Sequence, residues 1–378
     1  MTLAISSAFD GGNIRVVGVR DDGFDLEIVA DTNSDFLQWF YFRLTGAANR
    51  DVTLRIVNCA GSAYPGGWPD YRACMSADRE SWPRVPTTYE DGVLTITVTP
   101  PDDSVWFAYF APYTMERHHD LIASVIGLPG VEYRALGHSL DGEAIDYLRI
   151  GAGPLQAWVY GRQHPGEPMA EWWMEGALEK LTDEADPVSR RLRDRFTFHV
   201  VPNMNPDGTR RGHLRTNAAG VNLNREWHDP TAERSPEVLC VRDMMDETGV
   251  DFAIDVHGDE AIPYNFLAGF EGIPSLHDEQ QRLYALYGQT LERLTPDFQT
   301  THGYAQVPPG KANLSMSTTQ LAERFGALTM TLEMPFKDNE DLPDDDYGWS
   351  AERSAQLGRA CLDALHAISG QLRAAGAR

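Results

Sequence analysis

The sequence predicts an α/β protein with a mixed central sheet flanked by helices, preceded by an N-terminal antiparallel β-sandwich. Up to about residue 118, short β-type runs alternate with turn residues such as Asp21-Asp22-Gly23 and Glu90-Asp91-Gly92, which is typical of a sandwich or small barrel. Beyond that point, apolar strand-like runs alternate with helix-like runs, which is typical of a sheet covered by helices. We therefore expect two domains, residues 1–118 and 119–378.

The expected strands of the N-terminal domain are short and rich in β-branched and aromatic residues. They are Asn13 to Val17, Phe24 to Val29, Trp39 to Leu44, Val52 to Val57, Val93 to Val98 and Trp106 to Phe110. The sequence of this domain shows no constellation of His, Glu and Asp. The domain could shape a substrate site or bind a partner, but a folding scaffold is the simpler interpretation.

An expected helix over Arg117 to Ile126 leads into the C-terminal domain. Its expected strands are Leu148 to Ile150, Leu155 to Val159, Phe196 to Val201, Phe252 to Val256 and Leu328 to Leu332, and its expected helices cover 169–182, 235–248, 276–294, 316–325 and 350–373. Open sheets of this kind place their chemistry in loops at the carboxyl ends of strands.

The overall composition is that of a globular protein with 42% hydrophobic and 23% charged residues. Its net charge of −24 argues against nucleic acid and against an anionic membrane surface as partners, because both would be repelled. The four cysteines are widely spaced, which favours free thiols over a disulfide framework. We see no signal peptide and no apolar run of membrane-spanning length, and we expect a cytoplasmic protein.

A candidate metal motif stands in the stretch Gly161 to Pro168, where His164 and Glu167 lie three residues apart. The stretch follows an apolar strand, so both side chains can point at one spot, and together they can hold a zinc ion. His257 ends a second apolar strand and is the candidate for the third ligand; a satisfied core histidine is the alternative. Two nitrogens and one carboxylate leave a coordination position for water, as in a catalytic zinc site.

Glu333 closes the apolar strand Leu328 to Leu332, where a carboxylate is costly unless it is used or paired. It is the candidate general base, which would take a proton from water and return it to the leaving group. Arg225 beside Asn224 could hold a substrate carboxylate, and Arg215 could stabilise an oxyanion. For either arginine alone, a surface salt bridge is the simpler interpretation.

The motifs occur in a set order along the chain. They are His164-Pro165-Gly166-Glu167, Asn205-Pro206-Asp207-Gly208 (a turn by its residue types), Gly220 to Trp227, Asp255-Val256-His257-Gly258 and Thr331-Leu332-Glu333. In this order they resemble the zinc carboxypeptidase superfamily, and more closely its cytosolic carboxypeptidase branch with the bacterial relatives. Trp39 to Phe42, Trp82 to Pro86 and Tyr109 to Tyr113 are similar to the β-sandwich of that branch.

The resemblance implies a zinc metallocarboxypeptidase that binds one Zn²⁺ per chain through His164, Glu167 and His257. Glu333 is then the general base for water that the zinc activates. The substrate implied is the C-terminus of a peptide or protein, whose last peptide bond is hydrolysed.

For substrate binding, the resemblance implies that Arg215 polarises the scissile carbonyl and that Asn224 with Arg225 anchors the C-terminal carboxylate. It also implies a mobile tyrosine on the substrate side, for which Tyr304 is the nearest candidate in sequence. Lys311, flanked by Gly310, stands where the cytosolic branch has a glycine-flanked arginine. Lys311 is therefore a candidate partner for an acidic C-terminal side chain, which would make the enzyme deglutamylase-like; a surface lysine is the alternative.

One departure from the family concerns the support of the metal ligands. Many relatives carry Asp where this chain has Asn222, at a position thought to orient the first zinc histidine. As a hypothesis, Asp255, on the same strand face as His257, could compensate for the missing acid at position 222.

Two other functions stay open. A zinc deacylase or amidohydrolase of small N-acyl amino acids would share the H-x-x-E and His site. A catalytically silent peptide-binding protein would require the loss of Glu333 or of a ligand, and neither is missing from the sequence.

Overall fold

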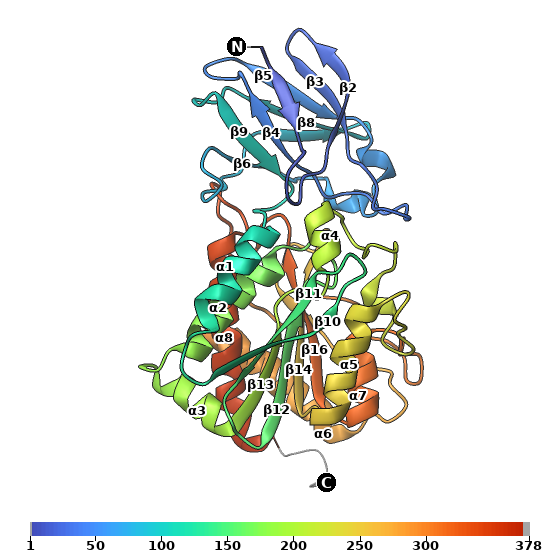
Figure 1. Cartoon of the computed structure of the whole chain (residues 1–378), viewed down its shortest axis with the longest axis vertical. Helices are drawn as coiled ribbons and strands as arrows, with labels where there is room; N and C mark the ends of the chain where they lie inside the picture. Colours follow the sequence, from blue (N-terminus) through green and yellow to red (C-terminus); the bar gives the residue numbers. More distant parts are fainter. Residues whose placement is uncertain (1, 373–378) are drawn as a thin grey trace.

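The computed structural model describes residues 2–372, and Figure 1 shows two parts stacked along the long axis of the molecule. The first part has a four-stranded sheet, ordered β1-β4-β9-β6, and a five-stranded sheet, ordered β2-β3-β5-β8-β7. The strands are β1 (Ala4–Ser6), β2 (Arg15–Arg20), β3 (Gly23–Glu27), β4 (Tyr41–Thr45), β5 (Val52–Ile56), β6 (Cys74–Ser76), β7 (Thr87–Glu90), β8 (Val93–Val98) and β9 (Ser104–Ala108). Every pair is antiparallel except β3 with β5, which is parallel. The predicted N-terminal sandwich is confirmed, with this one parallel pair in it.

Most predicted strands of the sandwich lie within one or two residues of the observed ones. The first is displaced, because β2 runs to Arg20 rather than ending at Val17. The sequence does not predict β1, β6 or β7, since strands of three or four residues are too short to show an alternating pattern.

The second part is built on a seven-stranded mixed sheet, ordered β10-β11-β13-β12-β14-β16-β15. Its central strands β13, β12, β14 and β16 are parallel, and β10, β11 and β15 join them antiparallel at the edges. The strands are β10 (Val131–His138), β11 (Ala144–Ile150), β12 (Leu155–Gly161), β13 (Phe196–Val201), β14 (Phe252–Asp259), β15 (Phe266–Ala268) and β16 (Leu328–Pro335). The central strands are buried on both faces and therefore appear in the sequence as continuous apolar runs. The mostly exposed β10 carries no such signal.

Helices cover both faces of this sheet, α2, α6 and α8 on one and α5 and α7 on the other. The helices are α1 (Met115–Val125), α2 (Met169–Thr182), α3 (Pro187–Arg195), α4 (Pro206–Arg211), α5 (Pro236–Thr248), α6 (Asp278–Leu294), α7 (Ser317–Phe325) and α8 (Ala351–Ile368), with the 3-10 helices η1 (Cys59–Gly61), η2 (Pro65–Gly67), η3 (Leu223–Arg225) and η4 (Ser369–Gln371). The helix predicted over 350–373 ends earlier, at Ile368, and residue 373 lies outside the described residues.

Two helices are absent from the prediction. The arginine-rich α3 has no apolar run to mark it in the sequence. The Asn-Pro-Asp-Gly stretch, expected as a turn, is the start of α4: Asn205 is the N-cap, and its Oδ1 accepts a hydrogen bond from Gly208 N at 3.0 Å.

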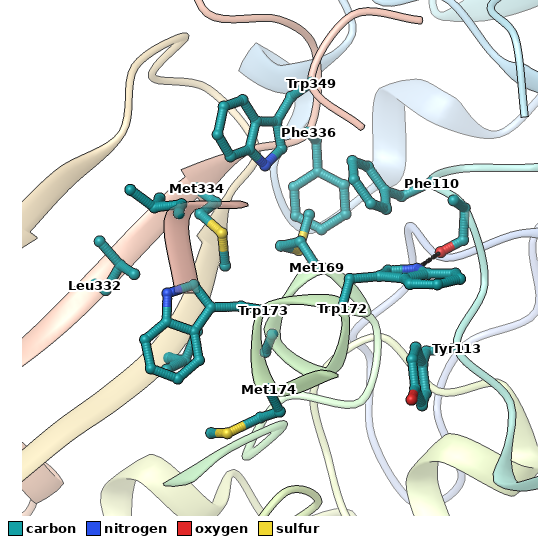
Figure 2. Packing of buried hydrophobic residues seen from close by; sticks show 14 of the residues in the cluster. Phe110, Tyr113, Met169, Trp172, Trp173, Met174, Leu332, Met334, Phe336 and Trp349 are labelled. Carbon is teal, nitrogen blue, oxygen red and sulfur yellow. Dashed lines mark hydrogen bonds between the residues drawn. The ribbon is translucent and has the colours of Figure 1, made fainter. Parts of the chain in front are cut away.

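The two parts share one continuous apolar core, which Figure 2 shows near the start of α2. Phe336, just after β16, stacks on Tyr109 with ring centroids 4.6 Å apart and meets Phe110 edge-on. Trp172 of α2 donates from Nε1 to the carbonyl of Ala111 at 2.9 Å. The chain leaving the sandwich is therefore fixed against the carboxyl end of β16.

We keep residues 1–118 and 119–378 as a proposed division, noting that α1 crosses it and packs on α2 and α4. Over the described residues, none of the helices combines the length and apolar character that crossing a membrane requires.

Candidate active site

The candidate residues gather at the carboxyl ends of three neighbouring parallel strands. Strand β12 has β13 on one side and β14 on the other, so the chain changes direction across the sheet at this point. Such a switch point opens a crevice beyond the strand ends. His164 follows β12, and His257 on β14 is in register with Glu333 on β16.

The three predicted metal ligands form one buried cluster. His164 Nδ1 lies 2.7 Å from Glu167 Oε1, and His257 Nδ1 lies 2.8 Å from Glu167 Oε2. The two Nδ1 atoms are 3.1 Å apart, and one atom from each residue lies within 4.8 Å of the others. Two imidazole nitrogens and a carboxylate oxygen that converge in this way fit the ligand chemistry of Zn²⁺.

The electrostatics of the cluster also suit a cation. Burial, reinforced by the charge of Arg215, lowers the pKa of His164 to about 4, which keeps this imidazole neutral as metal ligation requires. Burial alone would lower the pKa of His257, but Asp255 and Glu167 on either side raise it well above its usual value. This site therefore favours a positive charge at His257, which a divalent cation can supply in place of a proton.

The outer nitrogens of the two histidines face different partners. His164 Nε2 lies 3.1 Å from Oδ1 of Asn222, which also accepts from the backbone N of Asn224. His257 Nε2 lies 2.9 Å from Asp255 Oδ2 without forming a hydrogen bond. Asp255 thus supports His257, and the hypothesis that it replaces an acid beside His164 finds no support in the geometry.

Glu333 is buried, with 7% of its surface exposed, and is only partly paired. Its Oε1 accepts from the Tyr304 hydroxyl at 3.2 Å, and its Oε2 has no hydrogen-bond partner among residues 2–372. Burial is the main reason that its pKa lies well above the usual value; the charge of His257 opposes the shift and that of Glu167 adds to it. A buried carboxylate that has an unpaired oxygen and lies beside the three candidate metal ligands is placed for proton transfer.

The predicted substrate-binding residues Arg215, Asn224 and Arg225 are each held by local contacts. The Arg215 guanidinium lies against the rings of Phe36 and Tyr64, 5.6 Å and 5.5 Å from their centroids. The buried Asn224 accepts at Oδ1 from Ser317 N at 2.9 Å, and the exposed Arg225 donates to the Asn224 carbonyl at 2.6 Å.

Tyr304 and Lys311 belong to one exposed loop but differ in their contacts. The Tyr304 hydroxyl lies 2.7 Å from Asp259 Oδ2 and 3.2 Å from Glu333 Oε1, so the structure brings this side chain to Glu333. Lys311 is exposed and makes no side-chain hydrogen bond or ion pair in the part of the chain described. The structure does not join Lys311 to the cluster.

The sequence did not indicate three residues that contact Arg215 or its backbone, namely Asp31, Phe36 and Tyr64 of the sandwich. Asp31 accepts hydrogen bonds from the backbone at Leu214, Arg215 and Thr216. No motif marks these residues, because Asp31 and Arg215 lie 184 positions apart.

A buried ionic network supports residues 162–168, the loop after β12 that carries His164 and Glu167 and is called the metal loop below. His118 lies 2.7 Å from Glu171 and 2.9 Å from Asp146. Arg162, whose φ of 57° is unusual for a residue other than glycine, donates to Glu171 and to the carbonyl of Pro165, both at 2.6 Å. Asn203 donates to Glu171 as well.

The network makes stability dependent on pH. Burial alone would lower the pKa of His118, but Glu171 and Asp146 raise it to about 9. The bound proton therefore stabilises the fold fully below the unfolded-state pKa near 6.5, and this contribution, about 3 kcal/mol, is lost as pH rises through about 9. Urea unfolding should show a fall in the free energy of unfolding from pH 7 to pH 9.5 that is smaller in His118→Gln. The exposed neighbour His119→Gln should keep the wild-type slope; equal slopes in all three proteins would contradict the expectation.

Comparison with known proteins agrees with this geometry. Residues 5–110 match the family model described as the cytosolic carboxypeptidase N-terminal domain, and residues 129–339 match that of zinc carboxypeptidase. An uncharacterised protein of Zymomonas mobilis is 59% identical over 376 residues, covering 100% of this chain and 99% of that protein. A solved metallo-carboxypeptidase from Pseudomonas aeruginosa, in complex with (2-guanidinoethylmercapto)succinic acid, is 42% identical with a TM-score of 0.96, covering 98% of this chain and 100% of the other.

Human cytosolic carboxypeptidase 4 is 31% identical over an alignment of 292 residues that covers 64% of this chain but 26% of the human protein. This chain therefore spans about a quarter of that much longer relative. The matches to both family models and to a solved metallo-carboxypeptidase agree with one another. The chain belongs to the zinc carboxypeptidase family and is a metallocarboxypeptidase, a hydrolase.

Proposed function

We propose that the chain removes the C-terminal residue of peptides with His164, Glu167 and His257 holding one Zn²⁺ and Glu333 acting as general base. The observation that carries the proposal is the buried Glu333 carboxylate, in register with His257 and with a free Oε2. The ion, when bound, polarises the scissile carbonyl and lowers the pKa of water. Glu333 takes the proton of the attacking water and passes it to the leaving amine.

Two arginines support cleavage at the chain end rather than within it. Although the residue as a whole is exposed, partial burial of the Arg225 guanidinium, followed by the positive charge of Arg215, lowers the pKa of Arg225, so the two guanidinium groups lie close enough to repel. An anion bound between them would relieve this repulsion. We assign the terminal carboxylate to Arg225 and Asn224, and the developing oxyanion of the carbonyl to Arg215.

For the side chain of the departing residue, we propose a preference for acidic groups, with Lys311 as the partner. Lys311 is exposed and unpaired in the described chain, which leaves its ammonium available. The compound in the Pseudomonas aeruginosa structure carries both a succinic acid and a guanidinium group. Because that compound carries an acidic and a basic group, peptides with acidic and with basic C-terminal residues should both be tested as substrates. The net charge of −24 disfavours long acidic tails, so short peptides are the better substrates.

Lys311→Ala should raise KM for peptides that end in Glu by roughly 3- to 10-fold, because an exposed ion pair contributes about 1 kcal/mol. Peptides that end in Leu serve as the internal control and should be unaffected, and Lys311→Arg should restore binding of Glu. Steady-state kinetics on matched tripeptides ending in Glu, Leu or Arg measure this. Equal changes in KM for Glu and Leu would remove Lys311 from the specificity site.

The second candidate function is deacylation of small N-acyl amino acids, which can use the same zinc ligands and a carboxylate anchor. Release of the last residue from a tripeptide, compared with hydrolysis of an N-acyl amino acid, separates the two. We expect the tripeptide to be cleaved faster than the N-acyl amino acid, whether or not the N-terminus of the tripeptide is blocked. We also expect a chelator to stop the cleavage. Faster hydrolysis of the N-acyl amino acid would favour the deacylase.

We also propose that the enzyme works in a reducing, cytoplasmic compartment without nucleic-acid or membrane partners. Its four cysteines are free thiols, which suits a reducing environment. Its strong negative charge disfavours polyanionic partners. Recovery of the protein mainly outside the cytosolic fraction of the cells that produce it would contradict the assignment.

A further inference from the structure

The loop that carries Arg215 has no regular structure of its own. It leaves α4 at Gly212 and reaches η3 through residues 213–222, in turns and bends. Figure 1 shows α4 at the junction between the sandwich and the second part. A guanidinium on such a loop keeps one direction only if other segments hold its backbone.

Asp31, in the connection between β3 and β4 of the sandwich, provides this hold. Its Oδ1 accepts from Leu214 N at 2.6 Å, and its Oδ2 accepts from Arg215 N at 2.8 Å and Thr216 N at 2.9 Å. The Thr216 hydroxyl adds a fourth bond at 3.0 Å. Asp31 is 3% exposed, so these charge-assisted bonds form in a site with little water to compete.

The contact extends around Asp31. His213 Nε2 lies 3.0 Å from the Thr32 hydroxyl. Gly220, with a φ of 79°, approaches Asn33 so closely that a Cβ there would lie 2.3 Å from the Asn33 carbonyl oxygen. The Asp31 connection therefore contacts the Arg215 loop at residues 213–216 and again at Gly220.

On its other side, the Arg215 loop touches the metal loop. Gly166, between the ligands His164 and Glu167, donates from its backbone N to the Leu214 carbonyl at 2.8 Å. The same connection as Asp31 also supplies Phe36, which faces the Arg215 guanidinium together with Tyr64. The sandwich thus holds both the backbone and the side chain of Arg215.

We propose that Asp31 of the N-terminal sandwich is a positioning residue for the reaction: it fixes the backbone at Leu214 to Thr216 and so aims Arg215 at the carbonyl of the scissile bond. The inference rests on the role of Arg215 given under the proposed function. It assigns the sandwich a part in positioning a substrate-binding residue, beyond that of a folding scaffold.

The test is a double-mutant cycle on the full-length protein with Asp31→Asn and Arg215→Ala. An asparagine keeps the size but turns one NH₂ group toward backbone N–H donors. We expect Asp31→Asn to lower kcat by about 10- to 100-fold with a smaller change in KM, since aim matters most in the transition state. In the Arg215→Ala background, Asp31→Asn should change kcat by less than about 2-fold.

Asp35→Asn is the matched control, because Asp35 lies in the same connection, is exposed, and undergoes the same change of charge. It should leave kcat, zinc content and Tm unchanged. Zinc content should stay at the wild-type value in Asp31→Asn as well, which separates positioning of Arg215 from damage to the metal cluster.

The outcomes are distinguishable. If Arg215→Ala leaves kcat unchanged, the role assigned to Arg215 fails and this inference fails with it. If Arg215→Ala lowers kcat but Asp31→Asn does not, only the inference about Asp31 fails. The same holds if Asp31→Asn lowers kcat by the same factor with Arg215 present and with Arg215→Ala. Should Asp31→Asn not fold, Thr216→Val decides: losing one bond to Asp31 should lower kcat about 3- to 10-fold in the wild-type background only, and an unchanged kcat overturns the inference.

Discussion

Replacing Glu333 with glutamine should lower kcat by roughly 10²- to 10⁴-fold, the usual contribution of a positioned general base. Glutamine keeps the shape of the side chain and can still accept from Tyr304, but it cannot take a proton. KM should change little, because the group acts on the reacting water rather than on the bound peptide. Kinetics on a tripeptide, with zinc content measured on the same preparation, provide the result.

The matched control for this substitution is Glu340→Gln, an exposed glutamate whose carboxylate accepts from Tyr264 at 2.9 Å. We expect wild-type kcat for this variant. A Glu333→Gln enzyme with full zinc and wild-type kcat would rule out Glu333 as the base.

His257→Ala should abolish zinc binding and lower kcat/KM by about 10³-fold or more, since a metal ion supplies several kcal/mol of transition-state stabilisation and each 1.4 kcal/mol is tenfold in rate. The loss follows from the geometry, because removing the His257 imidazole would leave only His164 and Glu167 of the three proposed ligands. Mass-spectrometric metal analysis should give about one zinc per chain in the wild-type protein and much less in the variant.

A chelator distinguishes loss of metal from loss of structure. Chelated wild-type protein should be inactive and should recover on addition of zinc, whereas His257→Ala should not recover. His228→Ala is the control, since His228 is exposed and its carbonyl, which accepts from Arg242 at 2.9 Å, is kept. Retention of zinc by His257→Ala at the wild-type level would exclude this residue as a ligand.

The part of the fold that the sequence predicts best is the sheet centre with its long helices. Strands β12, β13, β14 and β16 are buried on both faces, so their apolar runs leave little choice of structure. The edge strand β10 is mostly exposed and has no continuous apolar run, so its place is decided by pairing with β11. Short strands of the sandwich depend on tertiary pairing in the same way.

The chemical identity of the site is also encoded locally. His164 and Glu167 are three residues apart, and His257 and Glu333 each end an apolar run, so residue type and position along a strand indicate the chemistry. Their convergence requires that β12, β14 and β16 be adjacent and parallel. The alternation of strands and helices in the sequence favours parallel strands, but only the strand order in the folded sheet makes these three adjacent.

The α/β class, the sandwich ahead of it and the residue types of a candidate zinc site could all be inferred from the order of residues in the chain. The resemblance already implied Asn222 beside His164, whereas the packed structure showed that Asp255 lies beside His257 and that Asp31 holds the Arg215 loop. The reason is that a carboxylate accepting backbone N–H groups 184 positions away leaves no periodicity and no spacing in the chain. Such a contact depends on where two separately folded segments meet, and only the packed molecule specifies that.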